Sequence, residues 1–406
     1  MLALALLRDP RYRNYWLALF ISQLGTWMQA AAQGWLVLEL TGSAERLGLV
    51  MVCQFLPSLV LSLPAGVLAD RHSRRNLLLL TQGGMAVLAG LMAVLILTDL
   101  IRYEYVLLFA FVYGAFNAID LPVRQSFTVE LAGRERYPGA IALNSFGFNV
   151  SRVTGPAVAG LLIAGVGLGW AYVLNALSFV IMLVLLLRTA SRAVESVHGS
   201  AVQQALEGLR YVWQEPLVRQ VVLMVGLASL FGMNFQTLVP AYSRLVLGLD
   251  AEGYGFLMSA VGVGAIGAAL LQAFTAQARP VRTLLGSGIL ALSLALLFLP
   301  LPPWGVAVAL AICGFGMITT LVNANTTVQL LVPDRLRGRV MSVYSMVLLG
   351  VAPVGGYLTG SLMDQLGGRT ASLVLSLLLV LSALWLSRRP WPRTVEERPR
   401  SVGGQR

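Results

Sequence analysis

Residues 188–219, RTASRAVESVHGSAVQQALEGLRYVWQEPLVR, form the longest polar stretch in a chain that otherwise consists mainly of apolar runs. Of the 406 residues, 57% are apolar and only 12% are charged, whereas a soluble domain has roughly 25% charged residues. Apolar runs lie on both sides of the polar stretch. It therefore predicts an aqueous linker between two halves, 1–187 and 220–387, with an Arg-rich tail, 388–406.

The apolar runs have the length of membrane-spanning helices, since about 20 apolar residues cross a hydrocarbon layer of ~30 Å. The glycine-rich stretch 165–169 divides the long run Tyr137–Leu187, and prolines 300, 302 and 303 separate the ninth run from the tenth. We expect an all-α membrane protein of twelve transmembrane helices in two six-helix halves. The remaining runs are Asn14–Leu38, Leu47–Ala69, Asn76–Thr98, Tyr105–Val129, Gln220–Ser243, Gly253–Ala278, Thr283–Leu299, Trp304–Val332, Val340–Met363 and Thr370–Ser387.

Arginine is concentrated in every second connection between the runs, and the alternate connections hold far fewer. Because positive residues stay on the cytoplasmic side of a membrane, we expect both termini in the cytoplasm and a location in a bacterial inner membrane. The net charge of +11 then reflects membrane topology and does not indicate a nucleic-acid partner. The arginine-rich connections hold Arg71, Arg74, Arg75, Arg134, Arg136, Arg188, Arg192, Arg279, Arg282, Arg335, Arg337 and Arg339, and the others hold Arg46, Arg102, Arg244 and Arg369.

Residues suited to catalysis or to metal binding are scarce in the apolar runs. Cys53 and Cys313 lie inside apolar runs, which argues against a disulfide or a metal site. His72 and His198 both fall in connections, and no phosphate-binding glycine loop is present. We expect no enzyme activity, no cofactor and no metal. Met1–Leu7 is too short for a signal peptide, and its charges lie on the wrong side.

The two halves share residues at an offset of about 200 positions, which suggests a duplication. Ser145 matches Ser345, and Gly160 matches Gly360. Parallel repeats of this kind build a central binding site that opens alternately to each side of the membrane.

The connection between the second and third runs reads GVLADRHSRR at residues 66–75. A glycine, an aspartate four residues later and a basic cluster resemble the loop motif of the major facilitator superfamily. Gly66 permits close helix approach, and Asp70 can cap a helix or pair with a basic residue in a lock that breaks when the halves move. The basic members of the motif are Arg71, Arg74 and Arg75.

Further motifs resemble the enterobactin-exporter-like branch of that superfamily, the transmembrane secretion effectors. They are ISQLGTWMQ (21–29), WLVLELTGS (35–43), DLPVRQ (120–125), ALNS (142–145), GPAVAG (155–160) and RGRVMS (337–342). The resemblance runs from about residue 10 to 387. It implies an exporter of small organic molecules driven by the proton gradient. The second copy of the loop motif, QARPVR at 277–282, departs from the pattern because it lacks the acidic residue.

Four polar residues of the first run, Ser22, Thr26, Gln29 and Gln33, follow one another at steps of four, three and four. That spacing places them on one face of a helix. A polar face in lipid is costly, so we expect it to line a substrate cavity or to join neighbouring helices through hydrogen bonds.

The fourth run contains Asp120 and Arg124, four residues apart. They can pair on one helix face, which lowers the cost of burying either charge. A helix rise of ~1.5 Å per residue puts Asp120 about 22 Å from the outer end of the run. Asp120 can therefore carry a coupling proton, or the two residues can form a structural ion pair.

The fifth run contains a single charge, Arg152. An arginine at this depth must face the protein interior, where it can bind an anionic group of the substrate or act on a protonatable acid. The residues that follow it, Gly155, Pro156 and Gly160, resemble the fifth-span signature of antiporters. Glycine and proline are also frequent in membrane helices generally, so packing alone can explain them.

The second half offers hydrogen-bonding residues but no charge for the cavity, chiefly Asn234, Gln236 and Asn323. Such a cavity suits a neutral or amphipathic ligand. We expect a monomer whose partners are a small-molecule substrate, protons and the lipid bilayer. A proton-coupled importer of the same fold is the main alternative, and the sequence leaves the substrate open among drugs, siderophores and metabolites.

Overall fold

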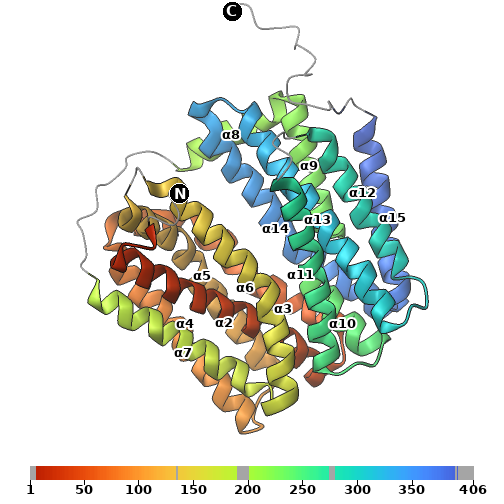
Figure 1. The fold of residues 1–406 in the computed structure, drawn as a ribbon, viewed down its shortest axis with the longest axis horizontal. Helices are drawn as coiled ribbons and strands as arrows, with labels where there is room; N and C mark the ends of the chain where they lie inside the picture. The colour runs from red at the N-terminus through yellow and green to blue at the C-terminus, as the bar shows by residue number, and fades with distance from the viewer. Residues whose placement is uncertain (1–5, 134–135, 190–200, 274–278, 389–390, 392–406) are drawn as a thin grey trace, which may run out of the picture. The chain divides into compact units, whose positions relative to one another are not determined.

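The computed structural model describes residues 6–133, 136–189, 201–273, 279–388 and 391, and these residues form helices and short connections without strands. Helices occupy the predicted apolar runs in the predicted order (Figure 1). The first six are α2 (Pro10–Thr41), α3 (Ala44–Arg71), α4 (Arg74–Leu97), α5 (Tyr103–Ala132), α6 (Tyr137–Val166) and α7 (Gly169–Arg188). They are followed by α8 (Ala201–Gln214), α9 (Pro216–Phe231), α10 (Phe235–Ala241), the π-helical turn η2 (Tyr242–Val246), α11 (Ala251–Ala273), α12 (Pro280–Leu296), α13 (Pro303–Leu331), α14 (Asp334–Leu366) and α15 (Gly368–Ser387).

Within the described residues, nine helical segments are long and apolar enough to cross a membrane. Residues 280–296 form a shorter apolar helix. This agrees with an all-α membrane protein, whereas the exact number of twelve spans stays a prediction.

The helices begin and end at residues with a recognisable local role. Asp9 caps α2 by accepting a hydrogen bond from the backbone N–H of Arg11 (3.0 Å), and Pro10 occupies the first turn. Gly42 ends the helix with a φ of 62°, a conformation that costs glycine little. Gly167, with a φ of 99°, makes the turn that was expected between α6 and α7.

The seventh predicted run, Gln220–Ser243, is not one continuous helix. It breaks between Phe231 and Phe235, where Asn234 donates its side-chain amide to the carbonyl of Leu230 (2.8 Å). A side chain that bonds the local backbone competes with helix propagation, and Gly232 at the break has a low helix propensity. Residues 216–246 are still one candidate membrane span.

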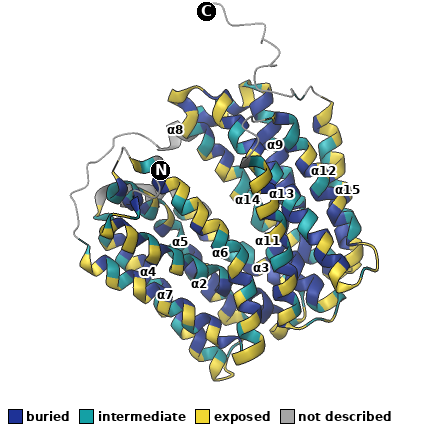
Figure 2. Cartoon of the chain, viewed as in Figure 1, coloured by how far each residue is buried: buried dark blue, intermediate teal, exposed yellow. Residues whose placement is uncertain are grey.

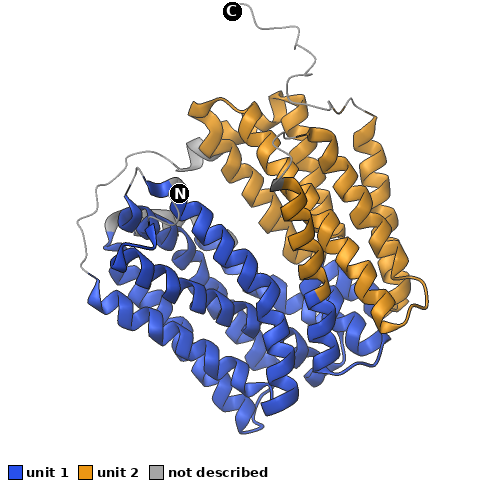
Figure 3. Ribbon diagram, viewed as in Figure 1, with its two compact units in different colours: residues 1–201, 235–259, 356–364 blue, residues 202–234, 260–355, 365–406 orange. Residues whose placement is uncertain are grey.

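The described chain divides into two compact units, shown in Figure 3. Unit 1 consists of residues 1–201, 235–259 and 356–364, and unit 2 contains the remainder. The segments 235–259 and 356–364, which the sequence assigns to the second half, thus pack with the first six helices. The predicted boundaries of the halves remain a proposal.

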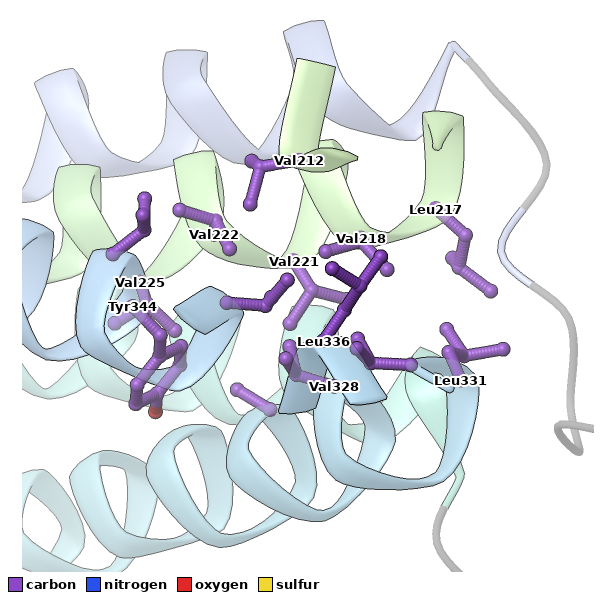
Figure 4. Packing of buried hydrophobic residues seen from close by; sticks show 14 residues of the cluster. Val212, Leu217, Val218, Val221, Val222, Val225, Val328, Leu331, Leu336 and Tyr344 are labelled. Atoms are coloured by element: carbon purple, nitrogen blue, oxygen red, sulfur yellow. The ribbon is translucent and has the colours of Figure 1, made fainter. Parts of the chain in front are cut away.

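In unit 1 a core of apolar side chains lies where α2, α4, α5 and α7 meet. Its fully buried members include Tyr15, Leu78, Val123, Phe127 and Leu186. In unit 2, side chains from α8, α9, α13 and α14 interdigitate, as Figure 4 shows for Val212, Val218, Val221, Val328 and Tyr344.

Large apolar side chains also remain exposed on the helices, and Figure 2 shows exposed residues along most of them. Leu108, Val263 and Leu381 are more than 60% exposed. An apolar exposed surface of this extent is expected of a protein surrounded by lipid.

Candidate functional site

The loop motif lies at the end of α3 and the start of α4. The side chains of Asp70 and Arg71 and the surroundings of Gly66 are not described, so the lock expected of Asp70 stays a prediction. Arg74 pairs with Glu130 at the end of α5 (3.2 Å). Arg75 donates to the carbonyls of Leu186 (2.7 Å) and Leu187 (2.9 Å), whose positions near the end of α7 favour a cation. The two arginines therefore tie the start of α4 to the ends of two neighbouring helices.

Asp120 lies in the middle of a hydrogen-bonded cluster in unit 1. Its side chain is 1% exposed and accepts hydrogen bonds from the hydroxyl of Thr81 and the amide of Gln82, both at 2.8 Å. The Nε of Arg124 lies 3.4 Å from the other carboxylate oxygen. The pair that was predicted from the spacing is present, and two uncharged donors join it.

Sequence reasoning missed Thr81 and Gln82, because they lie in an otherwise apolar run. Two adjacent polar residues in such a run are the signal that was available, since buried polar groups need partners. The Oε1 of Gln82 has none within the described part of the chain. This atom is therefore a free acceptor next to the carboxylate.

The cluster continues from Arg124 to α2 and α6. Thr128 donates to the carbonyl of Arg124 (2.9 Å), and its hydroxyl lies 3.0 Å from that of Tyr15. The side-chain amide of Asn144 also reaches Thr128, at 3.5 Å. Polar groups thus lead from the buried carboxylate across three helices.

The polar face of α2 makes contacts with its neighbours. Ser22, Gln29 and Gln33 are at most 4% exposed. Gln29 accepts a hydrogen bond from Asn175 on α7 (2.8 Å), and Gln33 donates to Gln54 on α3 (3.4 Å). These are the contacts expected of polar residues that join helices.

Thr26 differs from the other three residues of this face because it is partly exposed. It hydrogen-bonds the buried Tyr113 of α5. A cavity role for the face stays a prediction, and among the four residues Thr26 suits it best.

Arg152 lies near the middle of α6 and is not joined to Asp120. Its only hydrogen bond within the described residues goes to the side-chain oxygen of Asn149 (3.1 Å). The amide nitrogen of Asn149 in turn donates to the carbonyl of Ser145 (2.7 Å). Arg152 and Asp120 are therefore two separate charged sites in unit 1.

The antiporter-like residues of α6 are points of close helix packing. A Cβ on Gly155 would lie 2.6 Å from the Cβ of Trp27 on α2, and a Cβ on Gly160 would lie 2.8 Å from both the carbonyl oxygen of Ala251 and the Cα of Gly255. Pro156 lies buried between them. Small residues permit this approach, so packing accounts for both glycines, and an antiporter role stays a prediction.

The cavity candidates of the second half are distributed over both units. Asn323 donates to Gln272 (2.6 Å) within unit 2, and Asn234, described above, belongs to the same unit. Gln236 belongs to unit 1, where its carbonyl oxygen would lie 3.6 Å from a Cβ on Gly34. Within the described ranges, no three His, Cys, Asp or Glu side chains are grouped so as to hold a metal ion.

A family model described as transmembrane secretion effector matches residues 1–402. The multidrug efflux pump Tap of Mycolicibacterium fortuitum is 28% identical over 372 residues, which cover 88% of this chain and 90% of that protein. The enterobactin exporter EntS of Shigella boydii is 28% identical over 403 residues, covering 96% and 95%.

Solved structures resemble the chain over nearly its whole length. A bacterial homologue of the human lysosomal transporter Spinster, solved in an inward-facing and unoccupied conformation, has a TM-score of 0.75 at 16% identity and covers 97% of this chain and 100% of its own. At this identity the likeness concerns the fold, which is that of a membrane transporter.

Proposed function

Because the chain belongs to the transmembrane secretion effectors, a family of major facilitator transporters, we propose that it exports a small organic molecule in exchange for protons. The chain is a multi-pass membrane transporter, and the exporters it resembles move small molecules. We assign the exchanged proton to a buried side chain of unit 1. The observation that carries it is the buried carboxylate of Asp120, with Thr81, Gln82 and Arg124 around it.

A buried carboxylate is suited to proton coupling when its partners can change. Arg124 favours the charged form, whereas loss of that contact in a buried setting favours the protonated form. The side chain of Arg124 is 21% exposed, while that of Asp120 is 1% exposed. A small displacement of Arg124 towards solvent would therefore leave Asp120 buried without its counter-charge, and the carboxylate would bind a proton.

The chain acts as a monomer in the bacterial inner membrane with both termini in the cytoplasm, as two halves, 1–187 and 220–387, joined by the linker 188–219. It catalyses no chemical conversion and requires no cofactor, metal or nucleic acid. Asp70 and the arginines of the loop motif hold the cytoplasmic gate closed, and alternating access moves the substrate outward.

The experiment that tests proton exchange uses inside-out membrane vesicles that contain the wild-type protein in their membrane. Uptake of a panel of siderophores and cationic dyes is followed with and without an imposed pH gradient, acidic inside. We expect uptake that depends on the gradient. Uptake that ignores the gradient rejects the coupling, and flux only in the importing direction favours the proton-coupled importer.

The coupling residue is tested with Asp120→Asn, which keeps the side-chain volume and removes the titratable group. We expect retained substrate binding, retained counterflow without a gradient, and loss of the acceleration by the gradient. Asp334→Asn is the matched control, since the side chain of Asp334 is 89% exposed. Wild-type coupling in Asp120→Asn would identify the Asp120–Arg124 pair as structural.

A further inference from the structure

The middle of α6 presents a polar face that the proton site does not use. Ser145, Asn149 and Arg152 follow at steps of four and three, so they lie on one side of the helix. Ser145 and Asn149 are exposed, and Arg152 is partly buried. From Tyr137 at the start of α6, a rise of ~1.5 Å per residue places Arg152 about 22 Å along the helix.

We infer that this face points away from lipid. Towards the end of α6 the same side of the helix continues as Pro156 and Gly160, which are buried against Ala251 and Gly255 at the start of α11. The polar face at residues 145–152 therefore lies on the same side of α6 as the contact with α11, directly before it in the sequence. An arginine facing the hydrocarbon at this depth would be very costly.

Among the described residues, no acidic side chain forms an ion pair with Arg152. In the described part of the chain, arginines at 74, 124, 244, 337 and 339 form the ion pairs, and Arg152 is not among them. Asp120, the buried acid of unit 1, is already held by Thr81, Gln82 and Arg124. The guanidinium of Arg152 has five N–H donors, and one of its nitrogens donates to Asn149.

Asn149 fixes the position of the guanidinium. The Asn149 amide nitrogen is anchored to the carbonyl of Ser145, so its oxygen is the atom turned to Arg152. An arginine oriented in this way can donate two parallel hydrogen bonds to a carboxylate or a similar anion.

Aromatic side chains lie within a turn of the arginine along α6. Trp27 and Phe148 meet edge to face, with ring centroids 5.5 Å apart, and Phe148 is 43% exposed. A cation without an ion-pair partner among the described residues, an amide and exposed ring surface are groups that can bind an organic anion with an aromatic body.

We propose that Arg152, positioned by Asn149 and flanked by Trp27 and Phe148, binds the anionic group of the exported molecule, and that the substrate class is aromatic organic anions. This assignment rests on the proposed export function, because it names the substrate class of the same transporter. It separates the two charged sites of unit 1: Asp120 carries the proton and Arg152 carries the substrate charge. It also replaces the expectation of a neutral ligand, which was based only on the uncharged residues Asn234, Gln236 and Asn323.

Two dyes with the same xanthene ring system test the charge preference. Fluorescein is an anion and rhodamine 123 is a cation, and fluorescence anisotropy measures their binding to the purified full chain in detergent. A hydrogen bond to a charged group contributes roughly 1.5–3 kcal/mol, so tenfold or more in affinity. We expect fluorescein to bind the wild type about tenfold more tightly than rhodamine 123.

Substitution of the arginine then locates the preference. We expect Arg152→Gln to lose at least about tenfold in fluorescein affinity while rhodamine 123 binding is retained or improved, which also shows that the variant is folded. Arg152→Lys should recover part of the loss, because it restores the charge but not the paired donors. Arg102→Gln, which removes an exposed arginine before α5, should bind both dyes as the wild type does.

Equal affinities for the two dyes in the wild type, or an anion preference that survives in Arg152→Gln, would overturn the assignment. Vesicle uptake of the same dyes separates this failure from failure of the proposed function. Gradient-driven uptake of rhodamine 123 without any role for Arg152 leaves the exporter intact and removes the anion site. Fluorescein binding that needs Arg152, without gradient-dependent uptake of either dye, rejects the proton-driven exporter and retains the binding site.

Discussion

At the scale of single residues, the closest contact between helices in unit 2 occurs at a glycine, where there is no room for a side chain. A Cβ on Gly264 of α11 would lie 1.7 Å from the carbonyl oxygen of Ala311 on α13, and a Cβ on Gly314 would lie 2.0 Å from that of Val261. The two helices therefore cross with their backbones in contact. Neither carbonyl can move without moving a helix, so these positions exclude any other residue.

We expect Gly264→Ala to destabilise the protein by about 1–3 kcal/mol, the usual cost of overpacking. Gly267→Ala is the control, because Gly267 lies three residues further along α11 and a Cβ there would meet no atom within 4 Å; a helical alanine at this position should be neutral or stabilising. Thermal unfolding of the detergent-solubilised variants, followed with a thiol-reactive dye, compares them. Equal melting temperatures for the two variants would contradict the observed crossing.

At the scale of elements, the first turn of α3 is capped by a residue from the far end of the chain. Asp364 in α14 accepts hydrogen bonds from the backbone N–H groups of Ala44 (2.9 Å) and Glu45 (3.0 Å) and from the hydroxyl of Ser43 (2.5 Å). Tyr357 donates its hydroxyl to Glu45 (2.6 Å). A carboxylate at a helix N-terminus is favourable because it satisfies free N–H groups and opposes the helix dipole.

We expect Asp364→Asn to speed amide hydrogen exchange at residue 44 or 45 by about fivefold, because the amide keeps one acceptor oxygen and the other N–H group loses its partner, at a cost of about 1 kcal/mol. Exchange measured by mass spectrometry on peptides covering the start of α3 provides the readout. Asp250→Asn is the control, since Asp250 caps α11 through the N–H of Gly253 (2.9 Å) and should affect that helix alone. An unchanged α3 in Asp364→Asn would show that the remote cap contributes nothing.

The elements also show where prediction from sequence succeeds and where it stops. Helix positions follow from the apolar runs, and the Asp120–Arg124 pair follows from a spacing of four on one helix. The donors Thr81 and Gln82 could not be assigned, because nothing in a sequence says which helix lies opposite a carboxylate. The cap at α3 joins residues 321 positions apart, and the break between α9 and α10 lies inside a continuous apolar run, at Gly232 and Asn234.

At the scale of the whole molecule, the segments 235–259 and 356–364 pack against the first six helices in unit 1. If alternating access operates, these contacts must open during each cycle. The hydroxyl of Ser43 lies 2.5 Å from a carboxylate oxygen of Asp364. We therefore expect Ser43→Cys with Asp364→Cys, in a chain whose Cys53 and Cys313 are replaced by alanine, to form a disulfide that keeps the contact closed until it is reduced.

We expect oxidation of this double variant to stop vesicle uptake and reduction to restore it, whereas each single variant should be indifferent to oxidant. Gel mobility after maleimide labelling confirms that the bond has formed. Undiminished uptake with the disulfide in place would mean that α3 and α14 stay together throughout the cycle, and that the moving boundary lies elsewhere.

Gly160 and Gly360, which match across the two halves, have the same neighbours in kind. Gly160 meets the first turn of α11 at Ala251, and Gly360 meets the first turn of α3 at Ala44, where a Cβ would lie 2.1 Å from the carbonyl oxygen. Within unit 1, each glycine thus meets the first turn of a helix that is distant in the sequence. Acidic residues accompany both meeting points, Asp250 and Glu252 at the first and Asp364 and Glu45 at the second, and a close contact with bare backbone is common to both. A side chain at either glycine would push the neighbouring helix start away, so both positions limit how closely the helices can be rebuilt by substitution.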